Sequence, residues 1–389
     1  MHKNKYIQQL ENIKLVIGNG FDLECKLKSS YKHFFKEQSS RYTKIIELYD
    51  NFCEVFDPFY QECISIKDFI DTNKYIKTIN VWDAFFAINK YTNNDLENKK
   101  WTDIETCIKS SLQDSSENTD VSWPYIFNLF TKTTVIRKEL TNFFFVCLIK
   151  SKIKSNCFSN KKAYYNFLLE ELKQFEKFFG EYVNNLSKIR CSEDSSCFYD
   201  DLSFSDYSET TVKKLCSIQN IKSIDSFNYT KIRIKDLEKL VYNINGNYEN
   251  PIFGIDSSEF NSEDPRVIFC KTSRRLENFM IENKTPIFRH FKNIIIYGHS
   301  LNKADYNYFF SLLDKINIID LNSQSKIIFA FTNFDEARYE EHKQELRDGI
   351  YKLFECYSKY RGNTTEPNRL LDALTTQNKV IMYEIEHLQ

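Results

Sequence analysis

The stretch IKLVIGNGFD, from Ile13 to Asp22, decides how the rest of the chain is interpreted. An apolar run ends there at Gly18 and Gly20, although the 389 residues contain only eight glycines. An apolar run that ends at a glycine predicts a buried strand. In a parallel sheet, the turn from the first strand to the first helix is where phosphates and riboses are usually held.

The two glycines and the aspartate that follows them each have two interpretations. Gly18 and Gly20 can take positive φ and let a ligand approach the main chain, and a following helix would offer unpaired N–H groups to an anion. The full GxGxxG spacing is absent because Leu23 occupies the third position, so a tight turn without a ligand is an equal alternative. Asp22 is either a site carboxylate or a helix cap.

Composition excludes several classes of protein. Hydrophobic residues are 42% of the chain and aromatics 16%, which provides a substantial core and excludes general disorder. The net charge of −1 gives no overall attraction to nucleic acid, so that partner is not expected. The eleven cysteines form no CxxC pair, so we expect reduced thiols and no metal site.

The terminal and apolar segments predict where the protein resides. The longest apolar run, FFFVCLI at 143–149, is far shorter than the roughly 20 residues that cross a bilayer. The N-terminus lacks the apolar core of a secretory signal. We therefore expect a cytoplasmic protein with no membrane partner.

Hydrophobic periodicity divides the chain into a sheet-forming part and a helical part. From about residue 41 to 190 the pattern is almost entirely helical, with its clearest apolar stripe between Tyr164 and Leu186. Strand candidates alternate with helical patterns elsewhere, which favours a mostly parallel sheet covered on both faces. We predict an α/β, Rossmann-like core from residues 1–40 and 212–389, with 41–211 as a large helical insertion. The strand candidates are IKLVI (13–17), SIDSF (223–227), VYNI (241–244), PIFGI (251–255), NIIIY (293–297), SKIIFAF (325–331) and KVIMYEI (379–385).

Polar clusters follow several of these strand candidates. They are SFNYT at 226–230, NINGNYENPIFGID at 243–256 and YGHSLNKAD at 297–305. With the first turn they make four clusters, and four of the eight glycines, at positions 18, 20, 246 and 298, lie where these strand candidates end. Because the carboxyl ends of parallel strands share one edge, we expect the four clusters to surround a single ligand-sized hollow.

Together with WTDIE at 101–105, these segments resemble the hallmark segments of the AbiH-type bacteriophage abortive-infection family. The resemblance covers both ends of the chain in the expected order, and the middle zone is family-typical in character only. It implies an antiphage role in bacteria, with a phage or host protein as the trigger. Related defence effectors also suggest a homo-oligomer.

A more distant likeness connects the same strand ends with sirtuin-type NAD-binding domains and a sirtuin-like sheet. Gly18-Asn19-Gly20 is similar to the glycine turn of that group, Asn228 to its strand-end Asn, Asn245-Gly246 to its His-Gly pair and Gly298-His299-Ser300-Leu301 to its Gly-x-Ser-Leu turn. In that group the Asn positions a water or the nicotinamide ribose, and the His is the base. The likeness implies NAD or a related nucleotide as ligand or substrate and no metal. The catalytic candidates are Asn228, Asp22, His299 and Asn245, and the nucleotide-binding candidates are Gly18, Asn19, Gly20, Phe21, Tyr229, Gly246, Gly298 and Ser300.

One position departs from the sirtuin pattern, because Asn245 stands where that group has histidine. Asparagine cannot exchange a proton near pH 7, and loss of a general base typically removes a factor of roughly 10² to 10⁴ in rate. Asp22 or His299 would then have to supply the base, although His299 also fits a hydrogen-bonded structural role. Three functions stay open: an effector that hydrolyses NAD, a nucleotide-binding sensor or interaction module without catalysis, and a nuclease-type toxin.

Overall fold

The structure is a computed structural model, and the chain in it forms two compact units. The first consists of residues 1–30, 180–251 and 277–389, and the second of residues 31–179 and 252–276. Residues 31–40 and 252–276, which were predicted to belong with the sheet, thus lie in the second unit, and the described residues 180–186 and 204–211 lie in the first. The described residues are 5–56, 65–92, 104–113, 121–131, 140–154, 157–186, 204–232, 234–235, 237–282, 290–333, 336–362 and 369–385.

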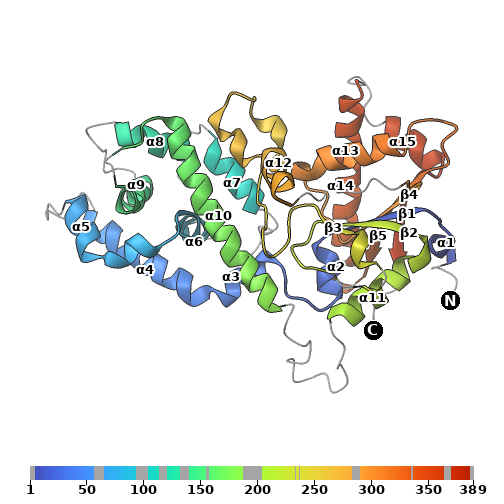
Figure 1. Cartoon of the computed structure of the whole chain (residues 1–389), viewed down its shortest axis with the longest axis horizontal. Coiled ribbons are helices and arrows are strands. Elements are labelled where there is room, and N and C mark those ends of the chain that lie inside the picture. Colours follow the sequence, from blue (N-terminus) through green and yellow to red (C-terminus); the bar gives the residue numbers. More distant parts are fainter. Residues whose placement is uncertain are drawn as a thin grey trace, which may run out of the picture. The chain divides into compact units, whose positions relative to one another are not determined.

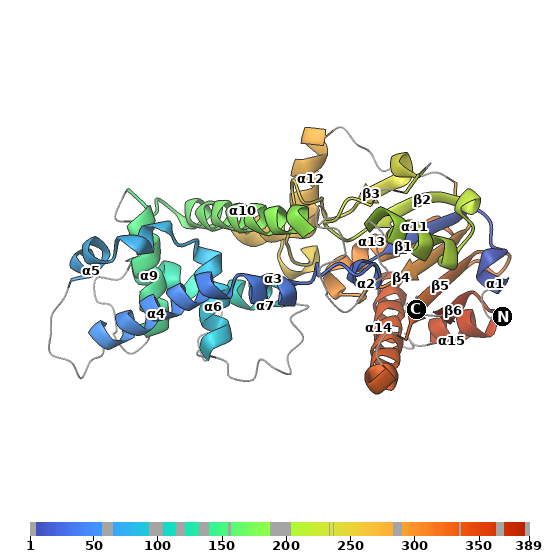
Figure 2. The ribbon, with the colours of Figure 1, turned by 90° about the horizontal axis from the view of Figure 1, so that it is seen from below.

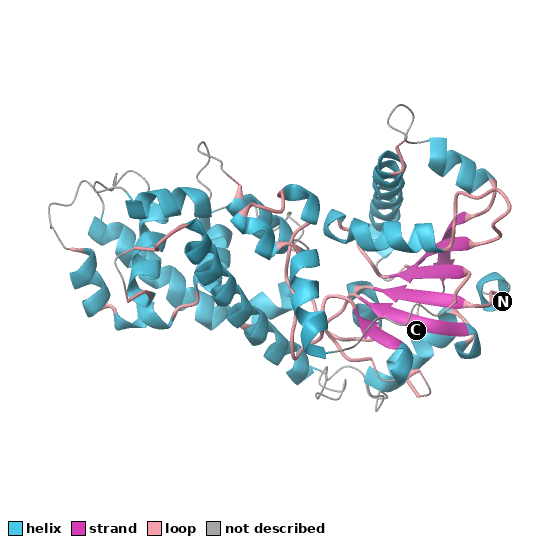
Figure 3. Cartoon of the chain, turned by 45° about the horizontal axis from the view of Figure 1, so that its top comes forward, coloured by secondary structure: helices cyan, strands magenta, loops and turns pink. Residues whose placement is uncertain are grey.

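A six-stranded sheet forms the centre of the first unit, with strand order β3-β2-β1-β4-β5-β6 (Figure 1). Every neighbouring pair is parallel, and Figure 3 shows the strands as arrows that point the same way. The predicted Rossmann-like α/β fold is confirmed. The strands are β1 (Ile13–Ile17), β2 (Ile221–Ser226), β3 (Val241–Asn243), β4 (Asn293–Tyr297), β5 (Lys326–Thr332) and β6 (Val380–Ile385).

Helices cover both faces of this sheet, because strands buried on both sides need apolar partners on each. All five residues of β1 are buried. Leu15 and Ile17 pack in one core with α1 (Lys5–Gln8), α2 (Asn19–Glu24) and α11 (Phe204–Leu215). On the other face, Val16 packs with α13 (Tyr306–Lys315), α14 (Tyr339–Tyr360) and α15 (Arg369–Thr376). These helices can be followed around the strands in Figure 2.

A buried ion pair interrupts the apolar packing of the sheet. The Lys14 Nζ of β1 lies 2.6 Å from the Asp225 Oδ2 of β2, and each side chain is 3% exposed. The Tyr308 hydroxyl of α13 donates to the same carboxylate oxygen. The Lys14 ammonium also lies 5.2 Å from the centroid of the Phe291 ring. A charged residue in the middle of an apolar strand is thereby neutralised inside the fold.

The second unit is helical and is packed with aromatic side chains. Its largest fully buried side chains include Trp82, Trp123 and Phe175. The predicted apolar stripe is confirmed in α10, where five residues from Tyr164 to Phe179 at spacings of three and four are buried. Its helices are α3 (Tyr31–Glu37), α4 (Ser39–Phe56), α5 (Ile66–Thr72), α6 (Val81–Thr92), α7 (Ile104–Leu112), α8 (Trp123–Thr131), α9 (Leu140–Lys152), most of α10 (Lys161–Leu186) and the first half of α12 (Lys271–Glu282).

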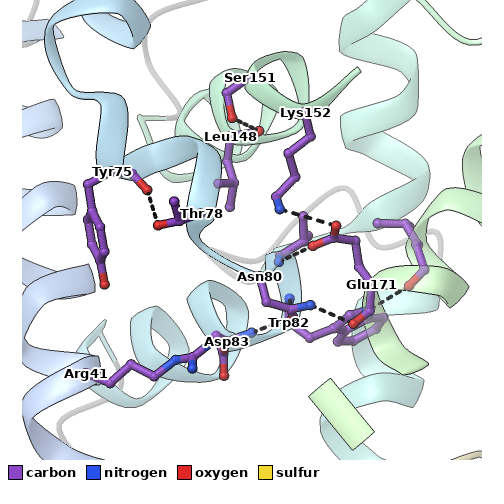
Figure 4. Close-up of polar contacts among 12 residues, drawn as sticks. Arg41, Tyr75, Thr78, Asn80, Trp82, Asp83, Leu148, Ser151, Lys152 and Glu171 are labelled. Carbon is purple, nitrogen blue, oxygen red and sulfur yellow. Dashed lines mark hydrogen bonds and ion pairs between the residues drawn. The ribbon is translucent and has the colours of Figure 1, made fainter. Parts of the chain in front are cut away.

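Polar side chains join helices within this unit. Asn80 caps α6 by accepting from the main-chain N–H groups of Trp82 and Asp83, and it donates to the Glu171 main-chain oxygen of α10 at 2.7 Å (Figure 4). The Glu171 carboxylate accepts from the Val81 N–H at 2.8 Å and pairs with Lys152 of α9 at 3.3 Å. One glutamate therefore joins α6, α9 and α10.

The WTDIE segment contributes a second such connection. Glu105 lies 2.6 Å from Lys271, and both side chains are largely buried. Arg274, one helical turn further along α12, holds the Glu176 carboxylate with two nitrogens at 3.1 and 2.7 Å. The first three residues of WTDIE, 101–103, lie outside the described residues.

The strand predicted for PIFGI at 251–255 is wrong. All five residues are buried, but the Phe253 N–H donates to the Glu176 side chain at 2.6 Å instead of to a strand. Only Ile255 makes an isolated bridge, to Cys270. A short apolar run indicates burial, and burial alone does not distinguish a strand from an extended core segment.

The buried ion pair generates a testable prediction. Lys14→Met would leave Asp225 as a buried carboxylate without its cation, and such a loss typically costs about 3–5 kcal/mol. Hydrogen exchange of the β1 and β2 amides should show correspondingly weaker protection. The double variant Lys14→Met with Asp225→Asn should regain most of that protection, because no uncompensated charge remains. Unchanged protection in Lys14→Met would show that the pair does not stabilise the sheet.

Candidate functional site

The candidate site lies at the carboxyl edge of the sheet, where β1 and β4 are neighbours. The Gly18 N–H donates to the Tyr297 oxygen at 3.0 Å, and the Gly20 N–H donates to the Gly298 oxygen at 2.8 Å. A Cβ on Gly20 would lie 2.7 Å from the Gly298 Cα, and a Cβ on Gly298 would lie 2.5 Å from the Phe21 nitrogen. Gly298 also has φ +65°. These glycines therefore allow two main chains to touch. The helix after the first strand was expected to offer unpaired N–H groups to an anion, and one N–H of its first turn, that of Gly20, is used in this contact instead.

Asp22, in the first turn of α2, is the centre of a buried polar cluster. It is 1% exposed. The Asn228 amide donates to its Oδ1 at 2.8 Å and to the Gly18 oxygen at 3.0 Å. The Thr230 hydroxyl lies 3.0 Å from both carboxylate oxygens. The residues after β1 and those after β2 are thus joined through one carboxyl group.

The two acceptors around Asn228 fix the orientation of its amide. A carboxylate and a main-chain oxygen both require donors, so the NH₂ group must face them. Its two hydrogens are then used, and only its Oδ1 can contact a ligand. Asn243, the last residue of β3, donates to the main-chain oxygens of Asn228 at 2.7 Å and Thr230 at 2.9 Å.

Burial raises the pKa of Asp22 from an ordinary value of 3.8 to about 7, although hydrogen bonds from Ser29, Thr230 and Asn228 oppose the shift. The Ser29 hydroxyl also lies 2.9 Å from the Asn19 Oδ1, so it chooses between two acceptors. Both protonation states of Asp22 are therefore populated near neutral pH. A group of this kind can accept or release a proton under physiological conditions.

His299 is held in the turn after β4. Its Nδ1 accepts from the Leu301 N–H at 2.9 Å, and its Nε2 lies 3.6 Å from the Asp305 Oδ2. The ring packs between Phe227 and Phe309, with centroids 4.4 and 5.1 Å away, and the side chain is 5% exposed. Both nitrogens face protein partners, and these contacts describe the structural role that the sequence analysis left open for this residue.

The other predicted site residues fall into three groups. Asn245 is buried in the turn after β3, and Gly246 beside it has φ +75°. Phe21 is fully buried and packs edge-on against Tyr297 in the core. The remaining side chains reach the surface: Asn19 and Ser300 are exposed, and Tyr229 is half-buried. The predicted residues therefore share one edge of the sheet, and Gly18, Gly20, Asp22, Asn228 and Gly298 are in direct contact.

Two site residues were missed by sequence reasoning, namely Thr230 and Asn243. Both stand inside the polar clusters quoted for the strand ends, so the signal was present. Their function depends on which atoms they face, and sequence does not show this.

Further features of the described residues bear on the site. Among them, no group of three or more His, Cys, Asp and Glu side chains is arranged to hold a metal ion. Every helix in this part of the chain is too short or too polar to span a bilayer. A surface hollow lined by Gln8, Lys213 and Ser217 lies before β2 in the chain and shares no residue with the candidate site.

The glycine contact predicts an unequal response to alanine. Gly298→Ala forces a side chain into positive φ, which costs about 1–2 kcal/mol even before the clash with the Phe21 nitrogen is relieved. Gly349→Ala is the matched control. Gly349 lies inside α14, and a Cβ added there would make an ordinary van der Waals contact with the Leu301 side chain at 3.4 Å. Thermal unfolding should give a lower Tm for the first variant and an equal or higher Tm for the second. Equal Tm values for Gly298→Ala and Gly349→Ala would contradict the close main-chain contact at Gly298.

The raised pKa of Asp22 predicts how stability changes with pH. Between its unfolded value of 3.8 and its folded value of about 7, unfolding releases a proton, so stability falls as pH rises through this window and is level above it. The full effect is at most roughly 4 kcal/mol. Asp22→Asn resembles the protonated acid, since its Oδ1 can accept from Asn228 and its NH₂ can donate to Thr230.

Urea unfolding at pH 5 to 8 gives the free energy of unfolding of the wild type and of Asp22→Asn, and the difference between the two at each pH measures this effect. The variant should gain stability relative to wild type as pH rises, with Asp348→Asn, in which an exposed carboxylate is lost, as the control. Parallel curves for wild type and Asp22→Asn would show that Asp22 ionises as it does in the unfolded chain.

Comparison with known proteins identifies the family of the chain. A family model described as "Bacteriophage abortive infection AbiH" matches residues 15–331, which is more than half of the sequence and includes all four strand-end clusters. Searches of curated proteins and of solved structures gave no match. The chain belongs to the AbiH family of bacteriophage abortive-infection proteins.

Proposed function

We propose that this AbiH protein is an abortive-infection effector that binds NAD or a related nucleotide at the carboxyl edge of its sheet and hydrolyses the N-glycosidic bond. The observation that carries the proposal is the cluster of Asp22, Asn228 and Thr230 beside β1. The strand order reverses direction between β1 and β4. In open parallel sheets, ligands bind outside the carboxyl ends of the strands at such a point.

The orientation of Asn228 indicates what the ligand must present. Its amide hydrogens are used by Gly18 and Asp22, so the free Oδ1 is an acceptor. A ribose hydroxyl or a water molecule can donate to it, whereas a phosphate oxygen cannot. This requirement agrees with the role of the corresponding Asn in sirtuin-type domains, to which the strand ends are distantly similar.

The proposed reaction breaks the bond between the ribose C1′ and the pyridinium nitrogen. The bonding electrons leave with neutral nicotinamide, and a cationic sugar forms that a nearby carboxylate stabilises electrostatically. Water then adds to C1′; it gives a proton to the Thr230 hydroxyl oxygen while that hydroxyl gives its own proton to ionised Asp22. The products are nicotinamide, ADP-ribose and one proton. Asp22 thereby takes over the proton transfer that Asn245 cannot perform.

A second function, nucleotide binding without hydrolysis, is favoured by the burial of Asp22. At 1% exposure this carboxyl group does not meet solvent directly. His299 also has both ring nitrogens directed at protein groups. A sensor that binds a nucleotide through Asn228 and passes the signal to a phage or host partner needs no base.

Incubation with NAD separates the two functions. The purified chain, with and without lysate of phage-infected cells, should release nicotinamide detectable by chromatography. Asn228→Ala should lower the rate by about 10²-fold or more, as expected for a misplaced reactant. Asn322→Ala, which changes an exposed asparagine outside the site, should not lower it.

Thermal shift measurements with NAD and ADP-ribose complete this experiment. A raised Tm with no nicotinamide released would select the binding function, since a ligand of the folded state stabilises it by mass action. Neither release nor a shift in Tm would contradict both.

A further inference from the structure

We propose that Asn243 is a positioning residue of the candidate site, which fixes the main chain of residues 228–230 and thereby aims the side chains of Asn228 and Thr230 at Asp22. The catalytic part of this inference rests on the proposed function. The positioning part rests only on the geometry of the strand ends.

Asn243 reaches the loop after β2 from the neighbouring strand. It is the last residue of β3 and pairs in register with Ser226, the last residue of β2. Its two amide hydrogens go to two main-chain oxygens in the same short loop, those of Asn228 at 2.7 Å and Thr230 at 2.9 Å. One side chain therefore holds the loop at two points that are two residues apart.

The opposite side of the loop is held by the first turn. Asn228 donates to Gly18 and Asp22, and Thr230 lies against both oxygens of Asp22. The loop is thus fixed between β3 on one side and the residues after β1 on the other. Main-chain oxygens that leave a sheet and stay buried need new donors, and Asn243 supplies them.

The position of the loop therefore depends on the two hydrogen bonds that the Asn243 amide donates, and not only on the volume of the Asn243 side chain. Without the amide of Asn243, the oxygens of Asn228 and Thr230 would turn toward solvent or other donors, and both side chains would move away from Asp22. An aspartate side chain at this position would be almost isosteric with asparagine but would place carboxylate oxygens against two carbonyls. A packing role predicts that Asn243→Asp is milder than Asn243→Ala, and a donor role predicts that it is at least as severe.

The first measurement is the kinetics of nicotinamide release from NAD. Asn243→Ala and Asn243→Asp should each lower kcat by roughly 10- to 100-fold with a smaller change in KM, because displacement of a reacting group by about 1 Å has effects of this size. The matched control is Asn247→Ala in the same segment, whose side chain accepts only from the Glu249 N–H among its described contacts. The control should keep wild-type kcat. If Asn243→Asp is milder than Asn243→Ala, or if Asn247→Ala loses as much activity, the donor role is wrong.

The second measurement does not need a reaction. Hydrogen bonds from Asn228 and Thr230 lower the pKa of Asp22, and the groups facing this carboxyl are these two side chains and Ser29, with Cys25 nearby. A loosened loop should therefore move the stability change that depends on Asp22 to higher pH. The free energy of unfolding is measured against pH for Asn243→Ala with and without Asp22→Asn, and for the wild type with and without Asp22→Asn. In each pair the difference contains only the titration of Asp22, and its midpoint pH is compared between the two pairs.

The two measurements distinguish failure of the inference from failure of the proposed function. If the wild type releases no nicotinamide, the hydrolase proposal fails, and the pH measurement alone decides on Asn243. If Asn243→Ala has the same midpoint pH as wild type, the inference is overturned whether or not the protein is a hydrolase.

Discussion

Direct contact between the main chains that follow β1 and β4 is the constraint on which the candidate site depends. The Gly20 N–H bonds the Gly298 oxygen, and no side chain fits at either residue. The chain can therefore enter α2 immediately after β1, which places Asp22 in the first helical turn and beneath the surface. A longer connection would carry this carboxyl group outward. The glycines thus act on the site indirectly, by bringing an acidic residue under the loop that follows β2.

The first unit contains two kinds of buried carboxylate, and their partners distinguish them. Asp225 faces a lysine at 2.6 Å, which compensates its charge and makes it part of the framework of the sheet. The donors around Asp22 are instead the neutral groups of Asn228, Thr230 and Ser29, so burial raises its pKa to about 7. A protein that only needed to fill this space could use an apolar residue without the desolvation penalty. A buried carboxyl group with a raised pKa, in the first helical turn after a strand, is the pattern expected of a functional site.

The sequence predicts the structure of a segment well where a local pattern sets it, and poorly where the segment bonds a residue far away in the chain. IKLVI and NIIIY were located to the residue, because each is an apolar run bounded by residues that end strands. PIFGI has the same appearance, yet its main chain bonds a glutamate about 77 residues earlier in the chain, and no local pattern records that partner. The residues of the candidate site also divide into those that the sequence predicted and those that it did not. Asp22 and Asn228 could be chosen by residue type and place, whereas Thr230 and Asn243 act through the particular atoms they face, which only the fold reveals.

The family segments therefore have two physical functions within one chain. Glu105 of the WTDIE segment forms an ion pair with Lys271. Phe253, in the middle of PIFGI, bonds the Glu176 and Arg274 pair, so these segments hold the helical unit together. The segments at the carboxyl edge of the sheet instead bring together the buried polar side chains of Asp22, Asn228 and Thr230. Membership of the AbiH family alone does not specify a reaction, because part of the shared pattern is structural. In the function proposed above, the chemistry comes from the few groups around Asp22, and the Asp22 proton and the Asn228 Oδ1 are the atoms that a ligand would use.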